Sequence, residues 1–260
     1  MEKNNHLRVV VRANYLAAAA LFRSSETTRY YLNGVCIEPR SDSGVTLISG
    51  DGHRAVFVRD SDGQCEWSGV EESKILSTPP ELLKHCKTSG RDCAQRWAVY
   101  GPKTVHVVYG KTAEDALEVV DNQVGELVAF THLGDTLIAA SYPDVRRCCP
   151  PRITDGIATN KMVSANAAYL ADFGAAGRLL SGNPRQSPAV SIVPPAKVTK
   201  SMSDDTLVEG QGPMWVSIGH EDLIGVLMPM RLDTLEIDMA RAGSIIDALP
   251  RPVEHAIAAE

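Results

Sequence analysis

The chain has 260 residues, of which 44% are hydrophobic and 22% charged, as in an ordinary folded protein. Its 26 basic and 32 acidic residues give a formal net charge of −6, which excludes a surface that is a nucleic-acid footprint throughout. The six cysteines form no C-x-x-C pair, and no run reaches the roughly 18 apolar residues of a membrane helix. We therefore expect a cytoplasmic protein with no metal, no cofactor and no membrane partner.

The first segments predict one helix and several strands. In chain order they are a strand at 7–13, a helix at 14–24, a strand at 29–39 and a hairpin at 43–60. Asn14 has the side chain of an N-cap, and the Asp51-Gly52 pair is typical of a hairpin turn.

The same order of elements recurs twice. The second unit is a short strand and helix at 73–87, with strands at 96–101, 104–110 and 125–143. The third is a strand and Ala-rich helix at 161–180, with strands near 189–195, 213–219 and 224–230. Loops of linker composition are expected at 60–72, 110–124, 181–188 and 196–212. This pattern indicates an internal repeat whose units are too small to bury a core singly.

Two further segments bear on the domain organisation. The proline-containing residues 148–158 have the composition of a boundary between packed units. Residues 233–260 carry apolar positions at helical spacing, which end before Pro250 and predict a terminal amphipathic helix. That helix could cover a site on its own subunit, contact another subunit, or pack on its own domain.

The segment 50–55 gathers three side chains that could carry chemistry. Asp51, His53 and Arg54 lie within four positions, but no serine in an elbow context and no metal-binding histidine pair accompanies them. A hairpin turn with polar flanks is favoured over catalysis, and a hydrolase using Asp51 and His53 is the rival hypothesis from another functional class.

The apolar run near the end of the third unit is unusual because Met228 and Met230 flank Pro229. Proline cannot donate to a strand ladder, and methionine is typical of adaptable surfaces that accept more than one apolar partner. A core strand ending in proline and a binding surface both fit this stretch.

Four separated motifs, "TRYYLNGV" (28–35), "DGHRA" (51–55), "YPDVRR" (142–147) and "VLMPMRL" (226–232), occur in the order and setting found in the bacterial sliding clamp, the beta subunit of DNA polymerase III. The chain resembles this family over about residues 5–232. The resemblance implies an α+β fold of repeated strand-helix-strands units, with helices on one face of antiparallel sheets. It also implies a non-catalytic processivity factor whose helices line a ring around DNA.

The resemblance further implies a hydrophobic cleft that binds peptides of polymerases and other clients. The matching positions are Leu32, Gly52, His53, Arg54, Pro143, Arg147, Val226, Leu227, Met228, Pro229, Met230 and Arg231. Cys148 falls where the family usually has an aliphatic residue. Basic residues that would face double-stranded DNA are few, namely Arg23, Lys84, Lys87 and Arg178, so a single subunit is expected to bind DNA weakly.

The chain departs from the family in its domains. Residues 1–147 resemble the second clamp domain, residues 148–232 a shortened third domain, and residues 233–260 form an extension. The first domain is expected to be absent, so the usual dimeric ring cannot form through its usual contacts. A homo-oligomer in a non-standard ring is one expectation, and an adaptor or decoy that competes for clients without encircling DNA is the alternative.

Overall fold

The computed structural model describes residues 6–68, 74–87, 90–123, 125–132, 135–150, 164–183, 185–186, 188–193 and 212–230. Two compact units are distinguished, Met1–Met230 and Arg231–Glu260. The second unit, with the helix predicted at 233–260, lies outside the described residues, as does most of the predicted boundary at 148–158.

Five strands form an antiparallel sheet, sheet A, in the order β5-β1-β7-β8-β9. They are β1 (His6–Arg12), β5 (Gln64–Ser68), β7 (Arg96–Tyr100), β8 (Thr104–Tyr109) and β9 (Leu127–His132). Most of these strands match the predicted segments, but β5 lies in the predicted loop 60–72, so that expectation was wrong. Its residues Gln64 and Glu66 alternate with apolar ones, as on the outermost strand of a sheet.

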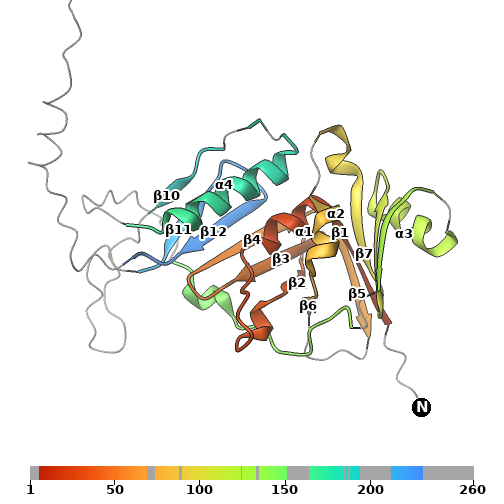
Figure 1. Ribbon diagram of the computed structural model, residues 1–260, viewed down its shortest axis with the longest axis horizontal. Helices are drawn as coiled ribbons and strands as arrows, with labels where there is room; N and C mark the ends of the chain where they lie inside the picture. Colours follow the sequence, from red (N-terminus) through yellow and green to blue (C-terminus); the bar gives the residue numbers. More distant parts are fainter. Residues whose placement is uncertain are drawn as a thin grey trace, which may run out of the picture. The chain divides into compact units, whose positions relative to one another are not determined.

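Seven further strands form sheet B, in the order β10-β11-β12-β4-β3-β2-β6. They are β2 (Val35–Pro39), β3 (Val45–Gly50), β4 (Arg54–Asp60), β6 (Ile75–Leu76), β10 (Ser191–Val193), β11 (Met214–Ser217) and β12 (Leu223–Leu227). All adjacent pairs are antiparallel, and β12 pairs with β4, which joins strands far apart in the chain (Figure 1). The predicted α+β class is therefore confirmed, while the division at residue 147 stays a prediction.

The helices of the described residues are α1 (Ala13–Ala20), α2 (Pro80–Cys86), α3 (Ala113–Asn122) and α4 (Ala167–Ser181). All eight residues of α1 are buried, and α1 contacts both α2 and α4. The main core is aliphatic and joins α1, α2 and α4 to one face of each sheet. No helix among the described residues is long and apolar enough to cross a membrane.

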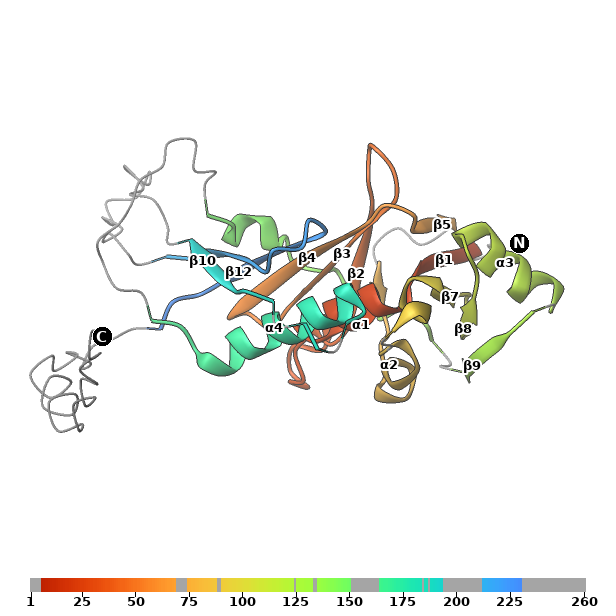
Figure 2. The same ribbon diagram turned by 90° about the horizontal axis from the view of Figure 1, so that it is seen from above.

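Helix α3 covers the opposite face of sheet A. Val10, Trp97, Val99 and Val108 form a second, smaller cluster with the buried alanines of α3, while their strand neighbours point into the main core. Figure 2 shows α3 and α2 on opposite sides of sheet A. The helices α1, α2 and α4 therefore lie on one face of the sheets, as expected from the sequence. Helix α3 lies on the opposite face of sheet A, which was not expected.

The prediction of a loop at 110–124 was wrong because this segment forms α3. Thr112 accepts a hydrogen bond from the backbone N–H of Asp115 (3.2 Å), and the Asp115 carboxylate accepts the N–H of Thr112 (3.2 Å), which is a complete capping box. Ala113, Ala116 and Val120 supply the apolar face. The acidic residues on the solvent side gave the segment its loop-like composition.

Two other local predictions were wrong. Asn14 is not the N-cap of α1 but a buried residue inside it, whose amide donates to the Leu179 carbonyl of α4 (3.2 Å). Tyr30–Leu32 forms a turn of 3₁₀-helix before β2, so the predicted strand 29–39 is shorter by its first residues. The strand predicted at the start of 161–180 lies partly outside the described residues, and Ser164–Asn166 are not in a strand.

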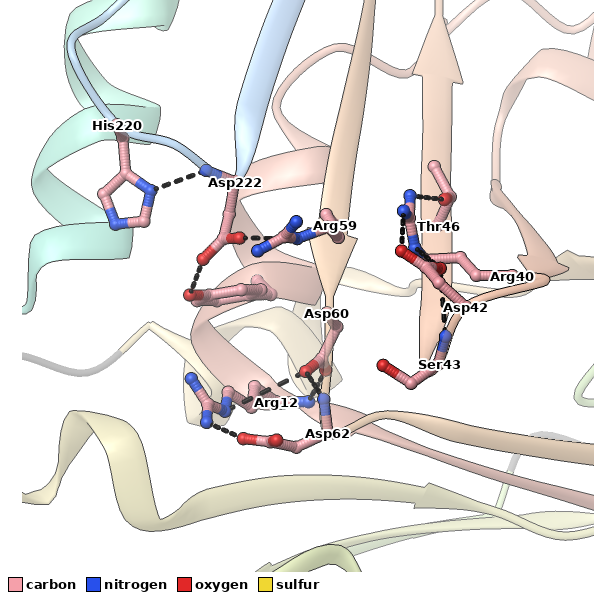
Figure 3. Close-up of polar contacts among 11 residues, drawn as sticks. Arg12, Arg40, Asp42, Ser43, Thr46, Arg59, Asp60, Asp62, His220 and Asp222 are labelled. Atoms are coloured by element: carbon pink, nitrogen blue, oxygen red, sulfur yellow. Dashed lines mark hydrogen bonds and ion pairs between the residues drawn. The ribbon is translucent and has the colours of Figure 1, made fainter.

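A buried carboxylate lies beside the residue that precedes α1. Asp60, at the end of β4, is fully buried and accepts the backbone N–H of Arg12 (2.7 Å), the residue before α1. The Arg12 guanidinium lies 3.9 Å from the same carboxylate and also pairs with Asp62 (Figure 3). These contacts tie β4 of sheet B to the end of β1, and the Arg12 guanidinium offsets part of the cost of burying the carboxylate charge.

We expect Asp60→Asn to remove a pH dependence of stability. Burial raises the pKa of the Asp60 carboxyl to about 6, although the N–H and guanidinium of Arg12 act in the opposite direction. Because the pKa is higher in the folded state, this contribution to stability is complete below about pH 4 and is lost as the pH rises through about 6. The native protein should lose up to about 3 kcal/mol from this group over that range.

Urea unfolding between pH 4.5 and pH 7 measures this effect. The Asp60→Asn variant should show a flatter dependence than the native protein, whereas Asp42→Asn, at an exposed carboxylate that pairs with Arg40, should keep the native slope. Parallel curves for Asp60→Asn and the native protein would contradict the assignment.

The turn between β11 and β12 is held against the first segments of the chain by Asp222. Its carboxylate accepts the Tyr15 hydroxyl (2.8 Å) and Arg59 Nε (3.1 Å), and its backbone carbonyl accepts the Arg59 N–H (2.8 Å). Figure 3 shows Arg59 and His220 on either side of Asp222. Burial, followed by the hydrogen bond to Asp222, raises the pKa of the Tyr15 hydroxyl. These contacts fix β12 in sheet B at the end remote from Met228.

Candidate functional site

Four chain segments meet around a cavity of about 320 Å³, which we call the groove. Its lining comes from the turn before β2, the β3–β4 hairpin, the segment after β9, and β12 with the residue following it. The lining residues are Arg29, Tyr31, Leu32, Gly50, Gly52, His53, Arg54, Ala55, Pro143, Asp144, Val145, Cys148, Val226 and Met228.

The floor of the groove belongs to sheet B. Val226 of β12 lies opposite Ala55 of β4, and Ala55 lies opposite Gly50 of β3. These residues alternate with those that enter the main core, so they occupy the other face of the sheet. Beyond β12, Met228 donates its backbone N–H to the His53 carbonyl (2.8 Å), which extends the floor by one residue.

Two short helical turns form the walls. The 3₁₀ turn Tyr30–Leu32 contributes Leu32, which is buried at 5% exposure. On another side, the 3₁₀ turn Val145–Cys148 follows Pro143. The Arg146 side chain in this turn makes a bidentate pair with Glu38 of β2, which fastens the turn to sheet B. The walls are therefore attached to the same sheet that supplies the floor.

The hairpin turn beside the floor is fixed by Asp51. Its Oδ1 accepts the backbone N–H groups of His53 (2.9 Å) and Arg54 (3.1 Å), and its Oδ2 accepts Arg54 Nε (3.1 Å). Gly52 has φ +93°, a backbone conformation that residues with a Cβ rarely adopt. Asp51 is thus occupied as a turn residue, because both of its carboxylate oxygens accept from these donors and not from the His53 ring that the hydrolase hypothesis would pair with it.

The structure brings together seven of the twelve predicted cleft residues: Leu32, Gly52, His53, Arg54, Pro143, Val226 and Met228. The other described ones do not line the groove. Leu227 points into the main core, and the Arg147 side chain is 85% exposed beside Asp144. Met230 is 53% exposed and donates its N–H to the Ser164 carbonyl (2.8 Å). Pro229 lies between the two methionines, and Arg231 lies outside the described residues.

Several lining residues escaped the sequence reasoning, namely Arg29, Tyr31, Gly50, Ala55, Asp144, Val145 and Cys148. Five of them lie inside the four motifs, and Gly50 and Cys148 directly adjoin a motif, but none of the seven was assigned to the cleft. The register of the predicted hairpin would have found Gly50 and Ala55, since a turn at 51–53 places them opposite each other. Cys148 departs from the family pattern in the sequence, and its exposed position in the groove comes from the turn Val145–Cys148.

The basic residues predicted to face DNA have different surroundings. The Arg23 guanidinium donates to the carbonyl and the hydroxyl (2.8 Å) of Thr78, and burial lowers its pKa. Lys84 and Lys87, in and just after α2, and Arg178 of α4 are exposed. Among the described residues, no group of three or more His, Cys, Asp or Glu side chains is placed to hold a metal ion.

No protein-family model matches the chain, and no curated protein matches it. Solved structures that it resembles include the DNA polymerase sliding clamp from Pseudomonas aeruginosa with ligand, at 16% identity and a TM-score of 0.47, over 87% of this chain and 66% of that one. The DNA polymerase III subunit beta from Borrelia burgdorferi in complex with a natural product matches at 14% identity and TM-score 0.41, over 86% and 64%.

The sliding clamp from Bartonella birtlesii bound to griselimycin matches at 17% identity and TM-score 0.42, over 89% of this chain and 68% of that chain. The chain thus spans about two thirds of the length of each of these clamps. They are proteins of the family that the four sequence motifs indicate. Since all three identities are below 25% and all three TM-scores are below 0.5, we base the function on the groove.

Proposed function

We propose that this protein is a non-catalytic, sliding-clamp-like accessory factor of DNA replication that binds short peptides of client proteins, such as a polymerase, in the groove. One observation carries the proposal. Segments around residues 29–32, 50–55, 143–148 and 226–228, recognised separately in the sequence, line a single cavity. If the four motifs resembled the family only by chance, there would be no reason for them to lie around the same cavity in the folded protein.

The groove has the chemistry of a site for apolar peptide anchors. Val226, Ala55 and Leu32 supply fixed apolar surface, and Met228, at 40% exposure, supplies a flexible side chain at the end of the floor. Methionine adapts to several partner shapes, so one groove can accept different client sequences. The residues of the hairpin turn add polar atoms around the rim, which give an extended peptide its direction.

A second candidate is an adaptor or decoy that binds the same clients without encircling DNA, and the charge of the helices favours it. Arg23 is engaged by Thr78, so only Lys84, Lys87 and Arg178 of the four residues predicted to face DNA are exposed. Non-specific DNA affinity scales with the number of phosphates neutralised, and three cations are few for this purpose. The solution mass separates the two, because a ring requires a closed oligomer.

Titration calorimetry with the full chain tests the proposed function. We expect a peptide with two apolar anchors typical of clamp-binding motifs to bind with micromolar affinity, driven by burial of its anchors in the groove. The same peptide with both anchors replaced by alanine is the control and should give no measurable heat. Absence of binding by the anchor peptide, with the protein folded, would overturn the assignment of the groove.

A further inference from the structure

Arg54 lines the groove, but its charged group is turned into the protein. The side chain is only 8% exposed. Its Nε donates to Asp51 Oδ2 (3.1 Å), its Nη1 to Asp172 Oδ2 of α4 (2.6 Å), and its Nη2 to the Leu21 carbonyl just after α1 (3.3 Å). A guanidinium has five N–H donors. All three of its nitrogens are therefore already directed at partners on three different elements.

Two aromatic rings enclose the same guanidinium. Its central carbon lies 5.1 Å from the centroid of Phe22 and 4.5 Å from that of Tyr169. A planar guanidinium suits such stacking, whereas an ammonium group cannot combine it with a fork of hydrogen bonds. The geometry selects arginine for its shape as well as for its charge.

These contacts connect α4 to residues that line the groove. Tyr169 also stacks on the His53 imidazole, with ring centroids 6.1 Å apart and planes at 21°. The backbone carbonyl of His53 in turn accepts the Met228 N–H at the floor. Neither Tyr169 nor Asp172 lines the groove, yet they contact Arg54 and His53, which do. The position of α4 is thus transmitted to the hairpin turn and to Met228.

We propose that Arg54 and Asp172 form a positioning pair, which holds the turn Asp51–Arg54 and the Met228 floor in the shape that receives a peptide. The proposal rests on the proposed function of the groove. It assigns Arg54 no direct electrostatic role toward the peptide, so the groove selects apolar anchors rather than an acidic side chain at this point. It also makes Asp172, outside the groove, a determinant of affinity.

Two variants and a matched control test this pair. Arg54→Lys keeps the positive charge but loses the stacked fork, and Asp172→Asn removes the partner charge without touching the groove. We expect each to weaken anchor-peptide binding at least fivefold, measured by fluorescence anisotropy. Arg59→Lys changes another arginine of β4, which pairs with Asp222 away from the groove, and should change affinity less than twofold.

Hydrogen exchange of the peptide-free protein supplies a second readout that general destabilisation would not produce. In Arg54→Lys and Asp172→Asn, the Met228 amide should exchange at least tenfold faster, while the amides of β7 in sheet A keep their native rates. A change in both sets would indicate a merely structural role and would overturn the proposal.

Two further outcomes would also overturn it. In the first, Arg54→Lys binds the peptide with native affinity, which would show that the charge alone suffices. In the second, Asp172→Asn keeps both the native affinity and the native exchange rate of the Met228 amide. If the native protein binds no peptide, the proposed function fails. The exchange experiment still tests the positioning pair in that case, so the two failures are distinguishable.

Discussion

Gly225→Ala is expected to lower the free energy of unfolding by about 3 kcal/mol or more, because overpacking a rigid core forces neighbouring groups out of place. A Cβ at this position of β12 would lie 2.1 Å from Cε1 of Phe173 and 2.6 Å from its Cζ. The Phe173 ring cannot withdraw easily, since it is fully buried and packs against Phe22 at a centroid distance of 4.6 Å. The added methyl group therefore pushes α4 away from sheet B.

Denaturant unfolding of the full chain measures this loss. Gly101→Ala, after β7, is the matched control, because a Cβ there meets nothing closer than Thr104 Oγ1 at 3.5 Å. Its free energy of unfolding should stay within about 0.5 kcal/mol of the native value. Equal stability of the two variants would mean that α4 does not seat against Gly225.

The double variant Leu32→Ala/Met228→Ala is expected to bind the anchor peptide about 30-fold more weakly, or by about 2 kcal/mol. Leu32 lies in one wall of the groove and Met228 at the floor, so truncating both removes apolar contact from two sides of a bound anchor. Buried anchors at the centre of an interface carry most of its binding energy, which is why the effect should exceed that of rim residues.

Ile224→Ala is the control for this experiment. Ile224 is also an exposed apolar residue of β12, at 39%, but it does not line the groove. Since Leu32 is itself buried, the folded fraction of each variant is measured first and the titrations are made where all are folded. Equal weakening by Ile224→Ala would place the peptide on the open face of sheet B instead of in the groove.

Local patterns in the sequence predicted most of the fold because each was strong on its own. The Val-rich β1 and the Ala-rich α1 differ in periodicity, and Asp51-Gly52 marks the hairpin turn. The failures occurred where composition was judged without periodicity. The acidic residues of 110–124 led to the prediction of a loop instead of α3, although Thr112 and Asp115 have the spacing of a capping box. Asn14 was assigned by residue type, whereas its burial under α4 follows from tertiary packing.

The site was predictable only in part for a related reason. The motifs supplied Leu32, His53 and Met228, but their meeting depends on the pairing of β12 with β4, which no local pattern encodes. Tyr169 and Asp172 carry no signal at all in the sequence. They reach the hairpin turn because α4 packs beside α1, and that contact is between segments widely separated along the chain.

The pairing of β12 with β4 also has a consequence for synthesis on the ribosome. Until residues 223–227 have emerged, β4 presents an unpaired edge of Ala55, Val56 and Val58. At typical elongation rates this interval lasts on the order of ten seconds or more. An open apolar edge invites pairing with other nascent chains. A holdase chaperone that shields this edge should therefore raise the soluble yield more than it changes the stability of the finished protein.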